Sequence, residues 1–114
     1  MRGRDTTEQR FFSYVMPEDR VPQDHPLRPI KKMVNRALTE LSTHFTSVYS
    51  RMGRPSIPPE MQLRATLLQI LYSIRSERLL MEQLEYNILF RWFVGLSMDD
   101  PVWGHSSFSK NRER

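Results

Sequence analysis

Residues 58–74, PPEMQLRATLLQILYSI, decide the fold class of this 114-residue chain. At about 100° per residue along a helix, one broad face is apolar and consists of Leu63, Leu67, Ile70, Leu71 and Ile74. The opposite side is also largely apolar, with Met61, Ala65, Leu68 and Tyr72. The stripe that remains is uncharged and holds Gln62, Thr66, Gln69 and Ser73. A helix that is apolar on most sides is enclosed by neighbours. The pattern predicts a helix from about Pro59 to Ile74 as the central element of a helical domain.

A long helix is expected before this segment. Apolar residues recur at helical spacing from Leu27 to Val48 and predict a helix near residues 26–49, with Asp24 as its cap and Pro26 in its first turn. A seam of residues seven apart runs along it, formed by Leu27, Val34, Leu41 and Val48. The seam predicts packing within this chain, with pairing to a second copy as the alternative.

Three shorter helices are expected after it. Ser76 with Glu77 starts the first, which Asn87 interrupts. A short piece follows and is ended by Gly95 in the left-handed conformation typical of helix ends. The last helix is expected to begin at Ser106 or Ser107.

The N-terminal segment has a different character. Residues 1–10 read as a polar arm, and residues 11–26 mix aromatic residues with three prolines, which indicates an extended, docked segment with little helix. Residues 1–25 are therefore predicted to be the arm and docked segment, and residues 26–114 a single helical domain. Since no segment alternates polar and apolar residues, the expected fold is all-α, a bundle of four to five helices.

The composition argues against several kinds of chemistry. The chain has no cysteine, which excludes disulfides, thiolate metal sites and cysteine nucleophiles. The histidines, His25, His44 and His105, form no i, i+4 pair for a metal, and Asp99–Asp100 before Pro101 is typical of a turn. We therefore predict no catalytic site, metal or cofactor. Without a secretory signal or a membrane-spanning segment, a cytoplasmic location is expected.

The chain carries a formal charge of +4, unevenly distributed. Residues 1–57 hold 10 basic and 6 acidic side chains, residues 58–105 hold 4 and 6, and residues 106–114 hold 3 and 1. Basic ends attract phosphate backbones, although many proteins of modest positive charge bind no nucleic acid.

The aromatic residues near the C-terminus admit two interpretations. A base-stacking platform or an apolar core could be formed by Phe90, Trp92, Phe93, Trp103 and Phe108. Because they alternate with aliphatic residues, a core is favoured. Arg91, in the middle of this stretch, either extends to the surface or pairs with an acid such as Glu82 or Asp99.

A helix-turn-helix is a further possibility. The helix at 59–74, a turn at 74–76 and the following helix have suitable lengths, with Arg75 and Arg78 at the start of the recognition helix. Glu82 and Glu85 on the same helix would repel phosphates. Packing of a bundle explains the pattern nearly as well.

Several stretches together resemble the InsH-like N-terminal domain of DDE transposases from bacterial insertion sequences. They are Gly53-Arg54-Pro55, Pro58-Pro59, the leucine-rich helix, YSIRSERLL, NILFRWFVGL and the terminal HSSFSKNRER. The chain departs from the family in four places: Gly104 where an acidic residue is common, Ser107 where threonine is, and Gln62 and Thr66 where leucine or alanine is usual.

The resemblance implies a DNA-binding and assembly module that recognises the terminal inverted repeats of a mobile element during DNA transposition. In that family a ribonuclease-H-like domain follows, so the catalytic acids would lie beyond Arg114 and this chain would be a truncated transposase without enzymatic activity. The expected partners are DNA at the transposon ends, with a second copy or the full-length transposase possible. The candidate DNA contacts are basic residues near helix ends or connectors: Arg51, Arg54, Arg75, Arg78, Lys110, Arg112 and Arg114. The alternatives are an oligomerisation module that makes no DNA contact, and a remnant with no function.

Overall fold

The computed structural model describes residues 15–52 and 57–112. In chain order the helices are α1 (Pro17–Arg20), α2 (Leu27–Met52), α3 (Pro59–Leu71), α4 (Glu77–Tyr86), α5 (Ile88–Val94) and α6 (His105–Arg112). The described ranges contain no strand, so the predicted all-α fold is confirmed. Five helices correspond to predicted ones. The single turn of α1 is additional and lies in the segment that was expected to be extended.

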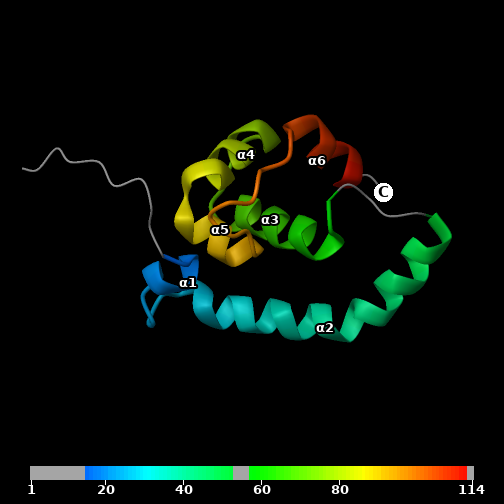
Figure 1. Cartoon of the computed structure of the whole chain (residues 1–114), viewed down its shortest axis with the longest axis horizontal. Helices are drawn as coiled ribbons and strands as arrows, with labels where there is room; N and C mark the ends of the chain where they lie inside the picture. The colour runs from blue at the N-terminus through cyan, green and yellow to red at the C-terminus, as the bar shows by residue number, and fades with distance from the viewer. Residues whose placement is uncertain (1–14, 53–56, 113–114) are drawn as a thin grey trace, which may run out of the picture.

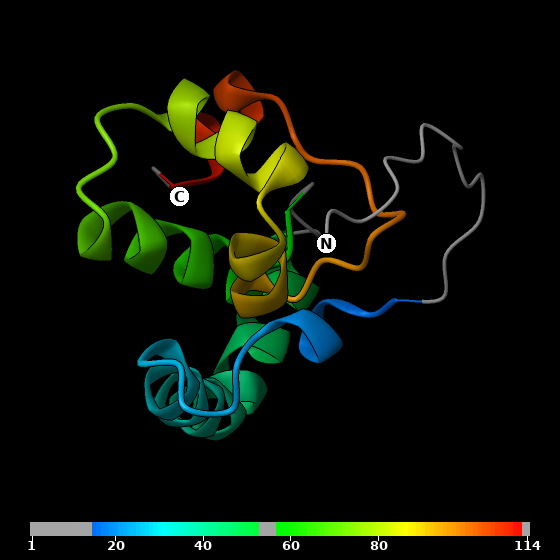
Figure 2. The same cartoon turned by 90° about the vertical axis from the view of Figure 1, so that its left-hand side faces the viewer.

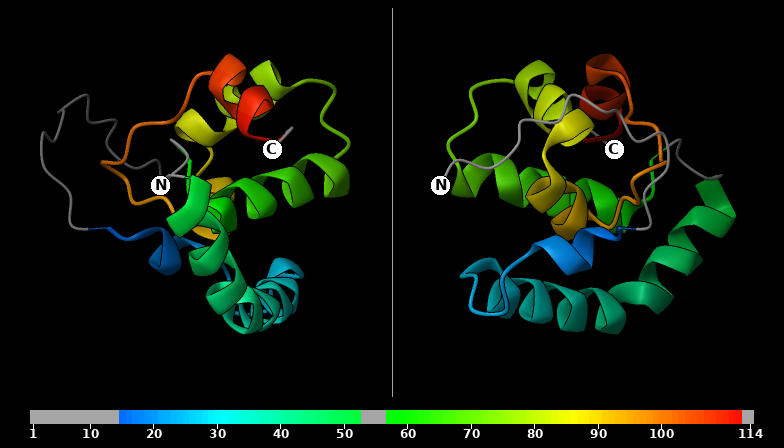
Figure 3. Two further views of the ribbon diagram at one scale, coloured as in Figure 1. Left: turned by 90° about the vertical axis from the view of Figure 1, so that its right-hand side faces the viewer. Right: turned by 60° about the vertical axis from the view of Figure 1, so that its left-hand side comes forward.

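The helices are arranged in layers (Figure 1). The pair α4 and α6 lies on one side, α3 and α5 lie in the middle, and α2 runs along the other side, with α1 between α2 and α5. The view in Figure 2 shows the same order. The C-terminal half of α2 bends relative to the N-terminal half and stands apart from the other helices (Figure 3).

The core is centred on α5. Five of its seven residues are buried, Phe90 to Val94, and the helix contacts α1, α3 and α4. The core also contains Phe108, and Trp103 packs against it. The prediction that the aromatic residues form a core is confirmed. The helix at 59–74 lies in the middle of the domain as predicted and contacts α2, α4, α5 and α6, but it is not enclosed on most of its sides.

The orientation of α3 explains this difference. Its buried row consists of Gln62, Ala65 and Leu68. On the broad apolar face, Leu63, Ile70 and Leu71 are 43%, 68% and 46% exposed. The helix therefore buries a narrow face that includes part of its polar stripe and leaves leucine and isoleucine at the surface.

The end of α3 also differs from the prediction. The helix stops at Leu71 instead of Ile74, because Ser73 adopts a left-handed backbone conformation with φ 52°. The Ile74 N–H donates to the Gln69 carbonyl at 2.9 Å and the Ser73 N–H to the Ile70 carbonyl at 3.3 Å. This pair of bonds is the Schellman pattern, in which glycine is the usual left-handed residue. Serine at that position concealed the helix end.

The other helix boundaries follow local signals, with two corrections. As predicted, Ser76 starts α4, with its Oγ accepting from the Leu79 N–H, Asn87 separates α4 from α5, and Gly95 ends α5 at φ 102°. Asn87 also caps α5, which was not predicted, through its side chain and the Phe90 N–H. At the start of α2, the Leu27 N–H donates to Nδ1 of His25, and not to the predicted cap Asp24. Helix α6 begins at His105, before the predicted serines, and the Gly104 carbonyl accepts the Phe108 N–H.

Arg91 does neither of the two things expected of it. Its side chain is 4% exposed and its guanidinium donates to three backbone carbonyls, those of Glu85 at 3.2 Å, Ser97 at 2.6 Å and Asp100 at 3.0 Å. The carboxylate of Asp100 in turn accepts the Ser97 N–H, which confirms the predicted turn. Arg91 therefore joins the end of α4 to the turn after α5 without an acidic partner.

Candidate nucleic-acid interface

Two of the seven predicted DNA contacts have described side chains, Arg75 and Arg78. Arg54 and Arg114 lie outside the described residues. For Arg51 on α2 and for Lys110 and Arg112 on α6, only the backbone is described.

Arg75 and Arg78 lie close together in the chain at the start of α4. Arg75 is exposed in the connector between α3 and α4, and Arg78 is exposed in the first turn of α4. Arg78 also lines a hollow of about 360 Å³ together with Glu82 and Glu85. The exposed face of α4 is thus of mixed charge, which weakens its attraction for phosphate. The connector spans residues 72–76, longer than the turn that the helix-turn-helix hypothesis assumed.

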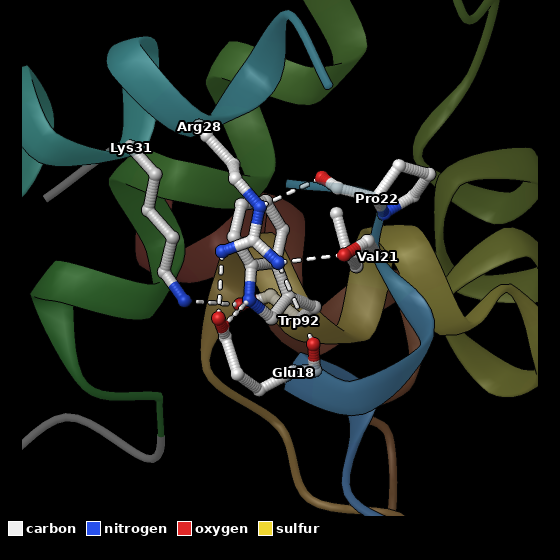
Figure 4. Close-up of polar contacts among 6 residues, drawn as sticks. All are labelled: Glu18, Val21, Pro22, Arg28, Lys31 and Trp92. Atoms are coloured by element: carbon white, nitrogen blue, oxygen red, sulfur yellow. Dashed lines mark hydrogen bonds and ion pairs between the residues drawn. The ribbon is translucent and has the colours of Figure 1, made fainter. Parts of the chain in front are cut away.

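A second basic region, absent from the predicted set, lies where α1, α2 and α5 meet (Figure 4). Its base is Trp92, which is 5% exposed and belongs to the core. The indole N–H donates to Oε2 of Glu18 on α1. The carbonyl of Trp92 accepts from the Lys31 ammonium at 2.8 Å.

Arg28, on the first turn of α2, ties α1 to α2. Its guanidinium forms an ion pair with Oε1 of Glu18 at 2.6 Å and donates to the carbonyls of Val21 at 2.6 Å and Pro22 at 2.8 Å. It also lies 5.1 Å from the centroid of the Trp92 ring. These contacts explain why the proline-rich segment stays docked. The hydrogen bonds from Arg28 and Trp92 hold the pKa of Glu18 below its ordinary value.

Lys31 is held by the same tryptophan. Its ammonium lies 4.2 Å from the centroid of the Trp92 ring, within range of a cation–π interaction. Burial lowers the pKa of Lys31; Glu18 opposes the shift, and Arg64 and Arg28 add to it. Lys31 is therefore a partly desolvated cation with one carboxylate, Glu18, and two other cations, Arg28 and Arg64, near it.

Arg64 extends the basic region from α3. It donates to Oδ1 of Asn35 on α2 at 2.9 Å and to the Val94 carbonyl at 3.4 Å. Burial lowers the pKa of Arg64, while Glu60 opposes that shift. Exposed cations follow along α2 at Lys32 and Arg36.

The result is a pocket of about 470 Å³, here called the α2 pocket, lined by Glu18, Gln23, Arg28, Pro29, Lys31, Lys32, Asn35 and Trp92. The sequence does carry a signal for it, since Arg28, Lys31, Lys32 and Asn35 recur at helical spacing. Glu18 and Trp92 are 74 positions apart, and nothing in the sequence connects them. The chemistry that this arrangement offers is recognition of an anion by cations and amide donors.

Two other kinds of feature are absent from the described residues. No three of their histidine or acidic side chains are grouped so as to hold a metal ion. None of the helices in those residues is long and apolar enough to cross a membrane.

The fold and the site together define a class of protein: an all-α domain with cations on two of its faces. The chain belongs to the family described as Transposase domain (DUF772), which matches residues 15–114. Comparison with curated proteins and with solved structures finds no match.

Proposed function

We propose that this chain is the DNA-binding and assembly domain of an insertion-sequence transposase, and that it recognises the terminal inverted repeats of its element. The match to the transposase domain family over residues 15–114 carries this proposal. The exposed arginines at the start of α4 and the cations of the α2 pocket support it, because contacts to phosphates supply much of the affinity for DNA. Strand cleavage belongs, in this proposal, to a separate catalytic domain.

A mobility-shift titration tests the proposal. The purified chain is mixed with a duplex of the element's end and with a shuffled duplex of equal length and composition. Tighter binding to the element's end is expected, as is loss of affinity when both Arg75 and Arg78 are changed to glutamine. Arg75→Gln and Arg78→Gln are also measured singly, and Arg20→Gln, which removes an equal charge at an exposed position on α1, is the control for each of them. Equal affinity for the two duplexes would contradict recognition of the repeats.

Self-association through α2 is a second candidate function. Leu27 at the start of the predicted seam is buried and Val34 packs against the core, but Leu41, in the C-terminal half of α2, is 45% exposed. Sedimentation should then show a concentration-dependent dimer that Leu41→Lys weakens. A strict monomer, alone and with full-length transposase, would exclude this function.

A further inference from the structure

We propose that the α2 pocket binds one backbone phosphate of the DNA through Lys31, Lys32 and Asn35. This inference rests on the proposed function and assigns part of the DNA contact to a surface on the side of the molecule opposite α4 (Figure 1).

Several hydrogen-bond donors of the pocket have no acceptor among the described residues. The Lys31 ammonium has three protons and donates one of them to the Trp92 carbonyl. Lys32 is exposed, and no described residue forms a hydrogen bond or ion pair with it. Asn35 directs its oxygen toward Arg64, so its NH₂ group remains without a partner in the described part of the chain. Phosphate oxygens accept hydrogen bonds from all of these groups.

The charge balance also favours an anion. Glu18 is the one carboxylate that lines the pocket, and both of its oxygens are already engaged, one by Arg28 and the other by the Trp92 indole. Lys31 and Lys32 line the same pocket, and neither forms an ion pair with a described carboxylate. Arg64 lies next to the pocket, where it donates to Asn35. A bound phosphate would offset the mutual repulsion of these cations and the cost of burying Lys31.

Two of the three donors, Lys31 and Asn35, are held in place before any ligand arrives. Lys31 is held over the Trp92 ring, and Arg28 anchors α1 and α2 to each other through Glu18 and two backbone carbonyls. Lys32 and Asn35 follow on the same helix. A ligand therefore meets Lys31 and Asn35 already in position, which lowers the entropic cost of binding, and Lys32 is ordered only when it contacts the ligand.

Lys32→Gln is the most direct test, because the exposed side chain of Lys32 can change without disturbing the core. Affinity is measured from 50 to 200 mM salt for the wild type and for Lys32→Gln, with Arg20→Gln as the control that loses the same charge elsewhere. The affinity of each protein falls as the salt concentration rises. If Lys32→Gln loses one phosphate contact, the fold-decrease in its affinity from 50 to 200 mM salt should be about threefold smaller than that of the wild type. The reduction should be the same for the element's end and for the shuffled duplex, since a phosphate contact carries no sequence information.

The outcomes separate the two proposals. If the wild type binds the element's end more tightly than the shuffled duplex but Lys32→Gln has the same salt dependence as Arg20→Gln, the pocket assignment is wrong and the proposed function stands. If the wild type binds no duplex, both are wrong.

A second readout uses Trp103→Phe, which leaves Trp92 as the only tryptophan. Its fluorescence should change on addition of duplex and remain unchanged with inorganic phosphate at the same phosphate concentration. An equal response to inorganic phosphate would assign the pocket to the free ion and overturn the proposal.

Discussion

Replacing Arg91 with methionine should destabilise the domain by about 3 kcal/mol. Methionine fills a similar volume, so the main loss is of hydrogen bonds to the carbonyls of Glu85, Ser97 and Asp100. Each such bond contributes on the order of 1 kcal/mol net, and the abandoned carbonyls stay partly buried. For a domain of this size the change corresponds to a decrease in Tm of about 10 °C.

Urea unfolding measures the total effect, and amide hydrogen exchange locates it. In Arg91→Met the N–H groups of Ser97 and Asp100, which are bonded within the turn, should exchange much faster relative to the rest of the domain. Leu84→Ala is the matched control, because it removes a fully buried side chain for a cost of about 3 kcal/mol without touching the turn. A loss below about 1 kcal/mol, or equal local exchange in the two variants, would refute the reasoning.

Four further predictions concern helix ends and pH. Ser73→Gly should stabilise the domain by about 0.5–1 kcal/mol in urea unfolding, since glycine adopts the left-handed conformation without strain; a loss of stability would contradict this. Gly95→Ala should destabilise it by about 1–2 kcal/mol through the backbone alone, because a Cβ there would meet its neighbours at an ordinary 3.7 Å. Ser76→Ala should cost about 1 kcal/mol through loss of the cap to Leu79, and Ser76→Asp should restore most of it. The lowered pKa of Glu18 gives stability that is fully present above its ordinary value of 4.5 and is lost as the pH falls through the lowered pKa, so Glu18→Gln should flatten the acid limb of stability against pH.

The sequence predicted the helices where local chemistry decides their ends. Proline at Pro59, the hydroxyl of Ser76 and the left-handed Gly95 each act within one turn of the chain. Such signals are visible without knowledge of the tertiary structure. The end of α3 was missed because Ser73 adopts a conformation that serine seldom takes, stabilised by bonds to Gln69 and Ile70.

The contacts that place the α2 pocket could not be predicted in the same way. Trp92 meets Glu18 and Lys31 from positions 74 and 61 residues away. Helical spacing shows that Arg28, Lys31 and Lys32 share a side of α2, but it does not reveal what that side faces. A lysine on a helix is ordinarily a solvated surface charge, so the sequence alone favoured that interpretation.

The burial of α3 shows what hydrophobic periodicity leaves undetermined. A helix with two apolar sides and a neutral polar stripe can bury either kind of surface, provided that the polar groups find partners. Here Gln62 donates to the Phe108 carbonyl of α6 at 3.0 Å, Thr66 to the Gln62 carbonyl at 2.9 Å, and Gln69 to the Ile74 carbonyl at 3.3 Å. Each of these side chains donates to a backbone carbonyl, which offsets part of the cost of turning the stripe inward. The amide oxygens of Gln62 and Gln69 are buried without a partner in the described part of the chain, so some of that cost remains. The absence of charge from that stripe was thus the signal for its burial, and the exposure of Leu63 and Ile70 is the consequence.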